Sequence, residues 1–159
     1  MKENIIYIPI VSIKQVRQSK AKYNSALSRP DDIVDLIYPM IKNSDREAIF
    51  IIGVDIKNIP NVINKVSVGT LNYVCAIPRD IFKPLILSNC ASFFLIHNHV
   101  SYGDICPSEA DKKVTSELYD SGKTINIILL DHLIIGQDKK YYSFQKAGLL
   151  PTGRTQFQK

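Results

Sequence analysis

The sequence of 159 residues lacks several features that define large classes of protein. Its only cysteines are Cys75, Cys90 and Cys106, too few and too scattered for a disulfide framework, which favours a reduced, intracellular protein. No apolar run approaches the roughly 20 residues of a membrane helix, so no membrane association is expected. Residues 5–13 are apolar, but they contain Pro9 and lack a small-residue cleavage pair, which argues against a signal peptide. We therefore expect a cytoplasmic location.

The rest of the composition is ordinary for one globular domain. Apolar residues make up 45% and charged residues 22%, which excludes a disordered tail protein, a collagen and a coiled coil. A chain of this length buries roughly two thirds of its unfolded surface and needs no cross-links to fold. We expect a domain over residues 30–150, preceded by a basic N-terminal leader (1–29) and followed by a C-terminal tail (151–159).

The net charge of +5 belongs to the leader. Residues 1–29 hold six Lys or Arg and one acid, whereas the rest of the chain holds 14 residues of each sign. Such an arm can bind nucleic acid or another acidic surface, or it can be a solvated extension. The second interpretation is favoured, because no aromatic residues are interleaved with a dense basic run.

Apolar patterning predicts alternating helices and strands, typical of a layered α/β domain. A helix is expected after Pro30, with Pro39 kinking or shortening it, on an apolar face made by Ile33, Leu36, Ile37, Met40 and Ile41. Further helices are expected over 78–90 and from 107 to about 121, the latter stopped by Gly122. Strands are expected at 5–13, 49–54, 62–68, 92–96 and 141–144, and residues 125–130 and 133–135 are expected to form one or two more.

The segment from His97 to Asp111 carries the most informative chemistry. Two histidines at i and i+2 on an extended chain point to the same side, so His97 and His99 can converge on one metal ion. Asp111 shares a helix face with the apolar Val114, and a carboxylate aimed at the core needs a strong partner such as that ion. In the alternative, Ser108 caps the helix and Asp111 merely favours its positive end.

Three protein ligands and one open position are typical of a catalytic zinc site, whose bound water has a pKa lowered toward about 7. Such a site needs a general base, and Glu47, just before a predicted buried strand, is a candidate. From the sequence alone, a solvated charge at the start of a strand is the favoured interpretation of Glu47. His132, in an apolar segment, is either a core histidine or a residue near the site.

Several segments follow one another in an order typical of a known family. They are Glu47–Asp55, Val66–Thr70, Pro78–Pro84, His97–His99, Pro107–Asp111, Leu130–His132 and Tyr141–Phe144. Together they closely resemble the RadC-like branch of the JAB/MPN (JAMM) metalloprotease superfamily. The resemblance implies a three-layer α/β/α fold with a mixed central sheet, related to cytidine deaminases. The chain departs from the family pattern at Val100, where proline is usual, and by one extra residue between His99 and Ser108.

The resemblance also implies roles for individual residues. His97, His99 and Asp111 would bind one zinc ion per chain, Glu47 would activate the zinc-bound water, and Ser108 would help to stabilise the oxyanion. The implied activity is cleavage of a peptide or isopeptide bond in a substrate that the sequence does not name. The alternative is a DNA-repair-associated or DNA-binding accessory protein with a non-catalytic metal site. A nucleoside deaminase is disfavoured, because the chain has neither a Pro-Cys-x-x-Cys nor a His-x-Glu motif.

Overall fold

A computed structural model describes residues 25–69, 76–100 and 105–151, together with Ser12, Val16, Ser19 and Tyr23. Most of the predicted leader, including nearly all of the predicted strand at 5–13, and the tail after residue 151 lie outside these residues. In chain order the elements are α1 (Pro30–Ile41), β1 (Ala48–Val54), β2 (Pro60–Val68), α2 (Pro78–Leu87), β3 (Ser92–Asn98), α3 (Glu109–Thr124), β4 (Ile128–Ile135), the short 3-10 turn η1 (Gln137–Lys139) and β5 (Tyr141–Ser143).

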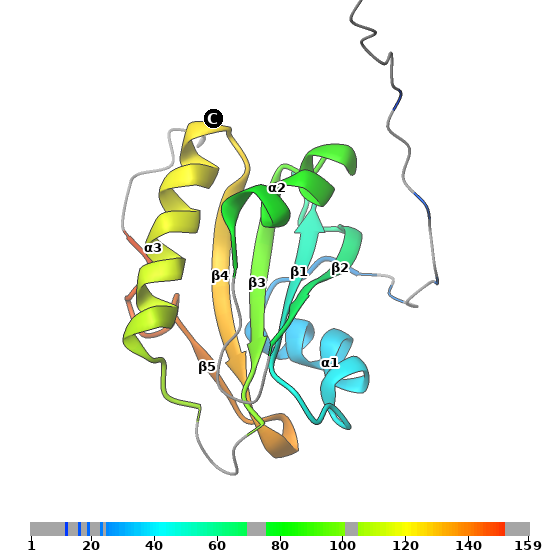
Figure 1. Ribbon diagram of the computed structural model, residues 1–159. Helices are drawn as coiled ribbons and strands as arrows, with labels where there is room; N and C mark the ends of the chain where they lie inside the picture. Colours follow the sequence, from blue (N-terminus) through cyan, green and yellow to red (C-terminus); the bar gives the residue numbers. More distant parts are fainter. Residues whose placement is uncertain are drawn as a thin grey trace, which may run out of the picture.

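The five strands form one mixed sheet, as predicted, in the order β2-β1-β3-β4-β5. Neighbouring strands are antiparallel except β3 and β4, which are parallel and are joined through α3. Helix α1 covers one face of the sheet, and α2 and α3 cover the other, which gives the three layers (Figure 1). Within the described residues, no helix has the length and apolar character needed to cross a membrane.

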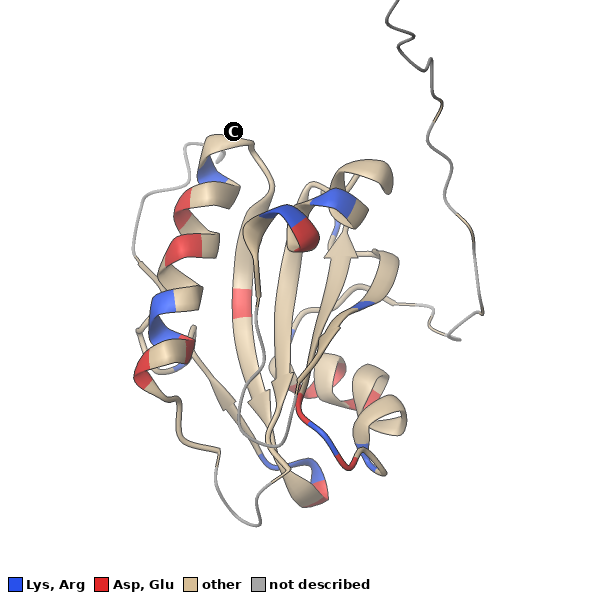
Figure 2. Ribbon diagram, in the orientation of Figure 1, with Lys and Arg blue, Asp and Glu red and all other residues tan. Residues whose placement is uncertain are grey.

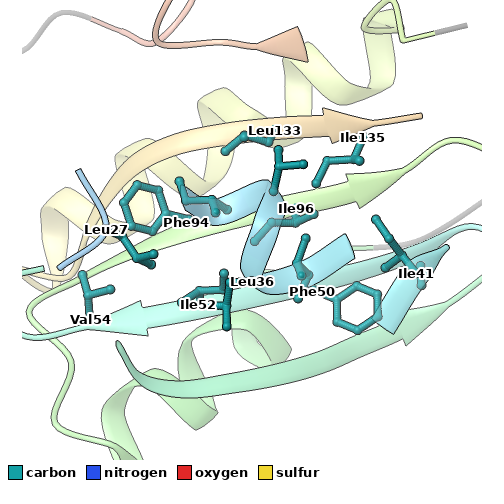
Figure 3. Close-up of a cluster of buried hydrophobic side chains, with 14 residues drawn as sticks. Leu27, Leu36, Ile41, Phe50, Ile52, Val54, Phe94, Ile96, Leu133 and Ile135 are labelled. Carbon is teal, nitrogen blue, oxygen red and sulfur yellow. The ribbon is translucent and has the colours of Figure 1, made fainter. Parts of the chain in front are cut away.

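Strand alternation decides which core each residue of β1 and β3 joins. Phe50 and Ile52 pack against α1, in the cluster drawn in Figure 3, whereas Ile49 and Ile51 pack toward α2 and α3. The same alternation aims the odd-numbered residues of β3 at the α2 and α3 layer, where Leu95 is buried. Side chains on this face at the carboxyl end of β3 therefore lie between the sheet and α3.

Helix α1 differs from its prediction at the predicted face. The other four predicted residues, Ile41 included, are buried, but Met40 is 43% exposed in the last turn of the helix. Pro39 lies inside the helix, two residues before its end. The leader boundary stays a prediction, but Leu27, on its leader side, is already buried in the α1 cluster.

Two further differences concern α3 and β4. Helix α3 continues to Thr124, so Gly122 lies inside it, buried, where a Cβ atom would collide with the carbonyl oxygen of Ile127. Close packing, rather than helix termination, therefore explains this glycine. The apolar residues after it, for which one or two strands were expected, form a single strand that begins only at Ile128, because Asp131 and His132 continue the pairing with β3.

Charged residues gather on the helices and connecting turns and are scarce on the central strands (Figure 2). Asp131 on β4 is the exception, and it is buried. Its carboxylate accepts hydrogen bonds from Ser143 Oγ at 2.6 Å and from the Gln145 backbone N–H at 2.9 Å. Burial raises the pKa of the Asp131 carboxyl, although these hydrogen bonds oppose the shift. Asp131 thus anchors the turn after β5.

Candidate metal centre

The register of β1 against β3 brings Glu47 to the two histidines. Ile49 pairs with His97, so continuing the antiparallel register by two residues sets Glu47 opposite His99. One ligand atom each of Glu47, His97 and His99 lies within 4.8 Å of the others. Glu47 Oε2 is 3.3 Å from His97 Nε2. Residues that are 50 positions apart in sequence therefore meet at one end of the sheet.

The two imidazoles lie edge to face, with ring centroids 4.8 Å apart and planes at 85°. The His97 side chain is buried, whereas those of His99 and Glu47 are 12% and 18% exposed. The backbone N–H of His99 donates to Ile135 O at 2.9 Å, which ties the end of β3 to β4. The cluster is thus held by the sheet on one side and open to solvent on the other.

Asp111 is the helix-capping partner of Ser108 and also contacts His97, while its role as a metal ligand stays a prediction. It occupies the third position of α3 and forms a capping box with Ser108, whose backbone N–H and hydroxyl donate to Asp111 Oδ2 at 2.8 and 2.5 Å. Its other oxygen, Oδ1, accepts a hydrogen bond from His97 Nδ1 at 3.0 Å. Burial raises the pKa of the Asp111 carboxyl, but the hydrogen bonds from His97 and Ser108 outweigh it and hold the pKa well below its usual range.

Both ring nitrogens of His97 face carboxylate oxygens, an arrangement that favours an additional positive charge. A carboxylate only accepts hydrogen bonds, so Asp111 takes the Nδ1 proton and leaves Nε2 of a neutral ring as an acceptor. This nitrogen faces the Glu47 carboxylate, a second acceptor. A shared proton or a cation reconciles the two. Asp111 Oδ2 is 4.0 Å from His99 Nε2, so it lies beside both imidazoles without belonging to the tight three-residue cluster.

Comparisons with known proteins show where this arrangement belongs. Residues 27–149 match the family model of the RadC-like JAB domain. The chain belongs to this family. It is 37% identical over 137 residues to a UPF0758 protein of Clostridium acetobutylicum, covering 86% of this chain and 59% of that protein. It is 37% identical over 124 residues to one of Methanosarcina mazei (78% and 53%), and 39% over 124 residues to one of Desulfitobacterium hafniense (78% and 54%). The chain thus spans little more than half the length of these relatives.

Asn98, which sequence reasoning missed, fixes the backbone on both sides of Glu47 in this RadC-like domain. It is buried, its Oδ1 accepts from the Ala48 N–H at 2.9 Å, and its Nδ2 donates to Arg46 O at 3.1 Å. These bonds flank Glu47 and hold it opposite the histidines. The available signal was the position of a polar residue between two candidate ligands.

His132 lies behind the cluster, on the strand next to β3 and opposite Leu95. It is 1% exposed and stacks on Phe144 with ring centroids 4.6 Å apart. Burial lowers the pKa of His132 to about 3. Its Nδ1 contacts Thr115 Oγ1 at 2.8 Å, a side-chain partner rather than the backbone partner expected of a core histidine.

Proposed function

We propose that this RadC-like domain is a zinc-dependent hydrolase of the JAMM class that cleaves a peptide or isopeptide bond. The observation that carries the proposal is the convergence of the Glu47 carboxylate and two imidazoles within 4.8 Å at a solvent-accessible end of the sheet. Two imidazoles and a carboxylate are a donor set that zinc binds. The facing acceptors of Glu47 and His97 also suit a cation. The membership of the JAB family supports the same chemistry.

In this proposal His97, His99 and Asp111 hold one zinc ion per chain. The role of Asp111 as a ligand rests on the family resemblance; in the structure its oxygens lie 3.0 Å from His97 Nδ1 and 4.0 Å from His99 Nε2, beside both imidazoles. When bound, zinc supplies a Lewis acid for the scissile carbonyl and lowers the pKa of a coordinated water toward about 7. The carboxylate remaining for acid–base work is then Glu47.

Glu47 acts as the general base. It is partly exposed at the rim of the site, where it accepts the proton of the attacking water and returns it to the leaving amine. Asn98 holds the backbone around Glu47, so the carboxylate is aimed before the substrate arrives. Ser108, at the N-terminus of α3, would stabilise the oxyanion once its hydroxyl, which donates to Asp111 Oδ2 in this structure, turns toward the substrate.

Replacing Glu47 with Gln shows whether this residue acts as the general base or as a zinc ligand. We expect Glu47→Gln to keep one zinc per chain by elemental analysis and to cleave a peptide library about 10²–10⁴-fold more slowly, because only the proton acceptor is lost. Glu109→Gln is the matched control, since Glu109 is exposed and pairs with Lys112 at 2.6 Å. Loss of zinc from Glu47→Gln would make Glu47 a ligand. A zinc-loaded wild type that cleaves neither peptide nor isopeptide substrates would overturn the proposal.

A further inference from the structure

Two buried side chains join α3 to β4 directly behind the candidate metal centre. Thr115 and His132 are each 1% exposed, and Thr115 Oγ1 lies 2.8 Å from His132 Nδ1. The same hydroxyl lies 2.6 Å from the backbone carbonyl oxygen of Asp111, one helical turn earlier. Thr115 therefore contacts both the sheet and the turn of α3 that carries Asp111.

The direction of these hydrogen bonds follows from the groups involved. A carbonyl oxygen only accepts, so the one hydroxyl proton of Thr115 goes to Asp111 O. The Thr115 oxygen is then the acceptor for the Nδ1–H of His132. This fixes the tautomer of His132 and leaves Nε2 bare. Among the described residues that nitrogen has no hydrogen-bond partner.

A histidine at this position lowers the stability of the fold unless another contact compensates. Burying an imidazole with one unpartnered nitrogen lowers stability, and such groups are rare in native proteins. The stacking on Phe144 needs only an aromatic ring. The feature that Phe or Tyr lacks here is the Nδ1–H donor aimed at Thr115. The requirement for that donor accounts for a histidine in the core.

We propose that Thr115 and His132 are positioning residues, which fix the first turns of α3 and thereby hold the Asp111 carboxylate against His97. The inference rests on the proposed metal-dependent function, in which Asp111 and His97 take part. Groups that orient metal ligands from outside the coordination sphere change metal affinity by about 10–100-fold when they are removed. The chain Thr115–Asp111–His97 provides such an arrangement.

Zinc affinity of the full chain, measured by competition with a chromophoric chelator, tests the proposal. Thr115→Val keeps the shape of the side chain and removes the hydroxyl, so we expect zinc binding about 10–100-fold weaker than in the wild type. Thr115→Ser restores the hydroxyl and should restore the affinity. Thr124→Val is the matched control, because Thr124 makes the same bond to a carbonyl four residues earlier, at the other end of α3. Cobalt(II) absorption spectra should change in Thr115→Val alone.

Wild-type affinity in Thr115→Val would overturn the inference. If Thr115→Val does not fold, His132→Phe, which keeps the ring and loses the donor, takes its place with the same expectation. Crystals of the metal-free variant give an independent readout. An Asp111 Oδ1 to His97 Nδ1 distance unchanged from 3.0 Å would refute positioning, whereas a widened one would support it. A wild type that binds no zinc would refute the proposed function, and this distance would still decide the role of Thr115 and His132.

Discussion

Acidification should destabilise the fold through His132. Burial lowers the pKa of His132 to about 3, against the ordinary value of 6.5. The unfolded chain therefore binds a proton at this residue below about pH 6.5, whereas the folded chain does so only near pH 3. The stability due to neutral His132 is complete above pH 6.5 and falls as the pH drops toward 3. Each unit costs up to about 1.4 kcal/mol, and the unfolded imidazole is only half protonated at pH 6.5, so lowering the pH from 6.5 to 4.5 should cost roughly 2 kcal/mol.

Two buried carboxylates also titrate, and the choice of window and variant separates them from His132. The pKa of Asp111 is lowered from 3.8, so its contribution is lost only at more acidic pH than this window. The pKa of Asp131 is raised, so its contribution has the opposite sign and grows on acidification. Replacing His132 with Phe leaves both carboxylates in place. The difference between wild type and variant therefore isolates the imidazole.

Urea unfolding of the metal-free protein, followed by circular dichroism at pH 6.5 and 4.5, measures this difference. The wild type should lose roughly 2 kcal/mol more of its free energy of unfolding than His132→Phe does between these two values. His132→Phe is expected to be less stable than the wild type at pH 6.5 if the hydrogen bond to Thr115 outweighs the gain from an apolar ring. An equal pH dependence in the two proteins would refute the burial of a neutral His132.

Three further predictions concern neighbouring groups. Asp111→Asn should lower the free energy of unfolding, measured in urea, by about 1–2 kcal/mol, because the helix cap is lost. The same variant should bind zinc at least tenfold more weakly in chelator competition, because His97 loses its carboxylate partner. Asn98→Ala should leave zinc content unchanged and lower the peptide-cleavage rate, because the backbone on both sides of Glu47 loses its partners; an unchanged rate would contradict this. Burial raises the pKa of Cys90 to about 11, so peptide mapping should find Cys90 unmodified by iodoacetamide at pH 8 until the protein is unfolded.

The sequence indicated those parts of the site that depend on local spacing. The His-x-His pattern on a strand and the Ser-x-x-Asp pattern at a helix start are set by residues within one element, and both have the expected geometry here. Glu47 could not be assigned from spacing, because its proximity to His97 comes from the pairing of β1 with β3 across 50 residues. The resemblance to a family supplied what periodicity could not.

Thr115 remained unidentified for a related reason. Its role depends on His132, which lies on a strand that reaches α3 only through the packing of the two layers. The signal present in the sequence was a hydroxyl four residues after Asp111 on the same helix face.

The fold could be predicted where apolar runs are long. It was harder to predict where a residue type, such as glycine or a polar residue in a strand, is found in more than one structural context. The buried runs of β1 and β3 predicted central strands. Gly122 indicated a helix end because glycine is frequent there, whereas its function is the close approach of α3 to Ile127. The sequence left one strand or two on either side of Asp131 and His132, and buried partners of both residues allow a single strand to continue through them.

The proposed function depends on the binding of one divalent cation by His97 on β3, His99 just after this strand and Asp111 on α3, beside Glu47. X-ray diffraction from crystals of the full chain grown with zinc, recorded on both sides of the zinc absorption edge, tests it most directly. We expect one anomalous peak per chain, about 2.0–2.1 Å from an imidazole nitrogen of both His97 and His99, bound also by Asp111, with Glu47 beside the open position. The absence of a peak between these histidines in a chain fully exposed to zinc would refute the proposed metal site.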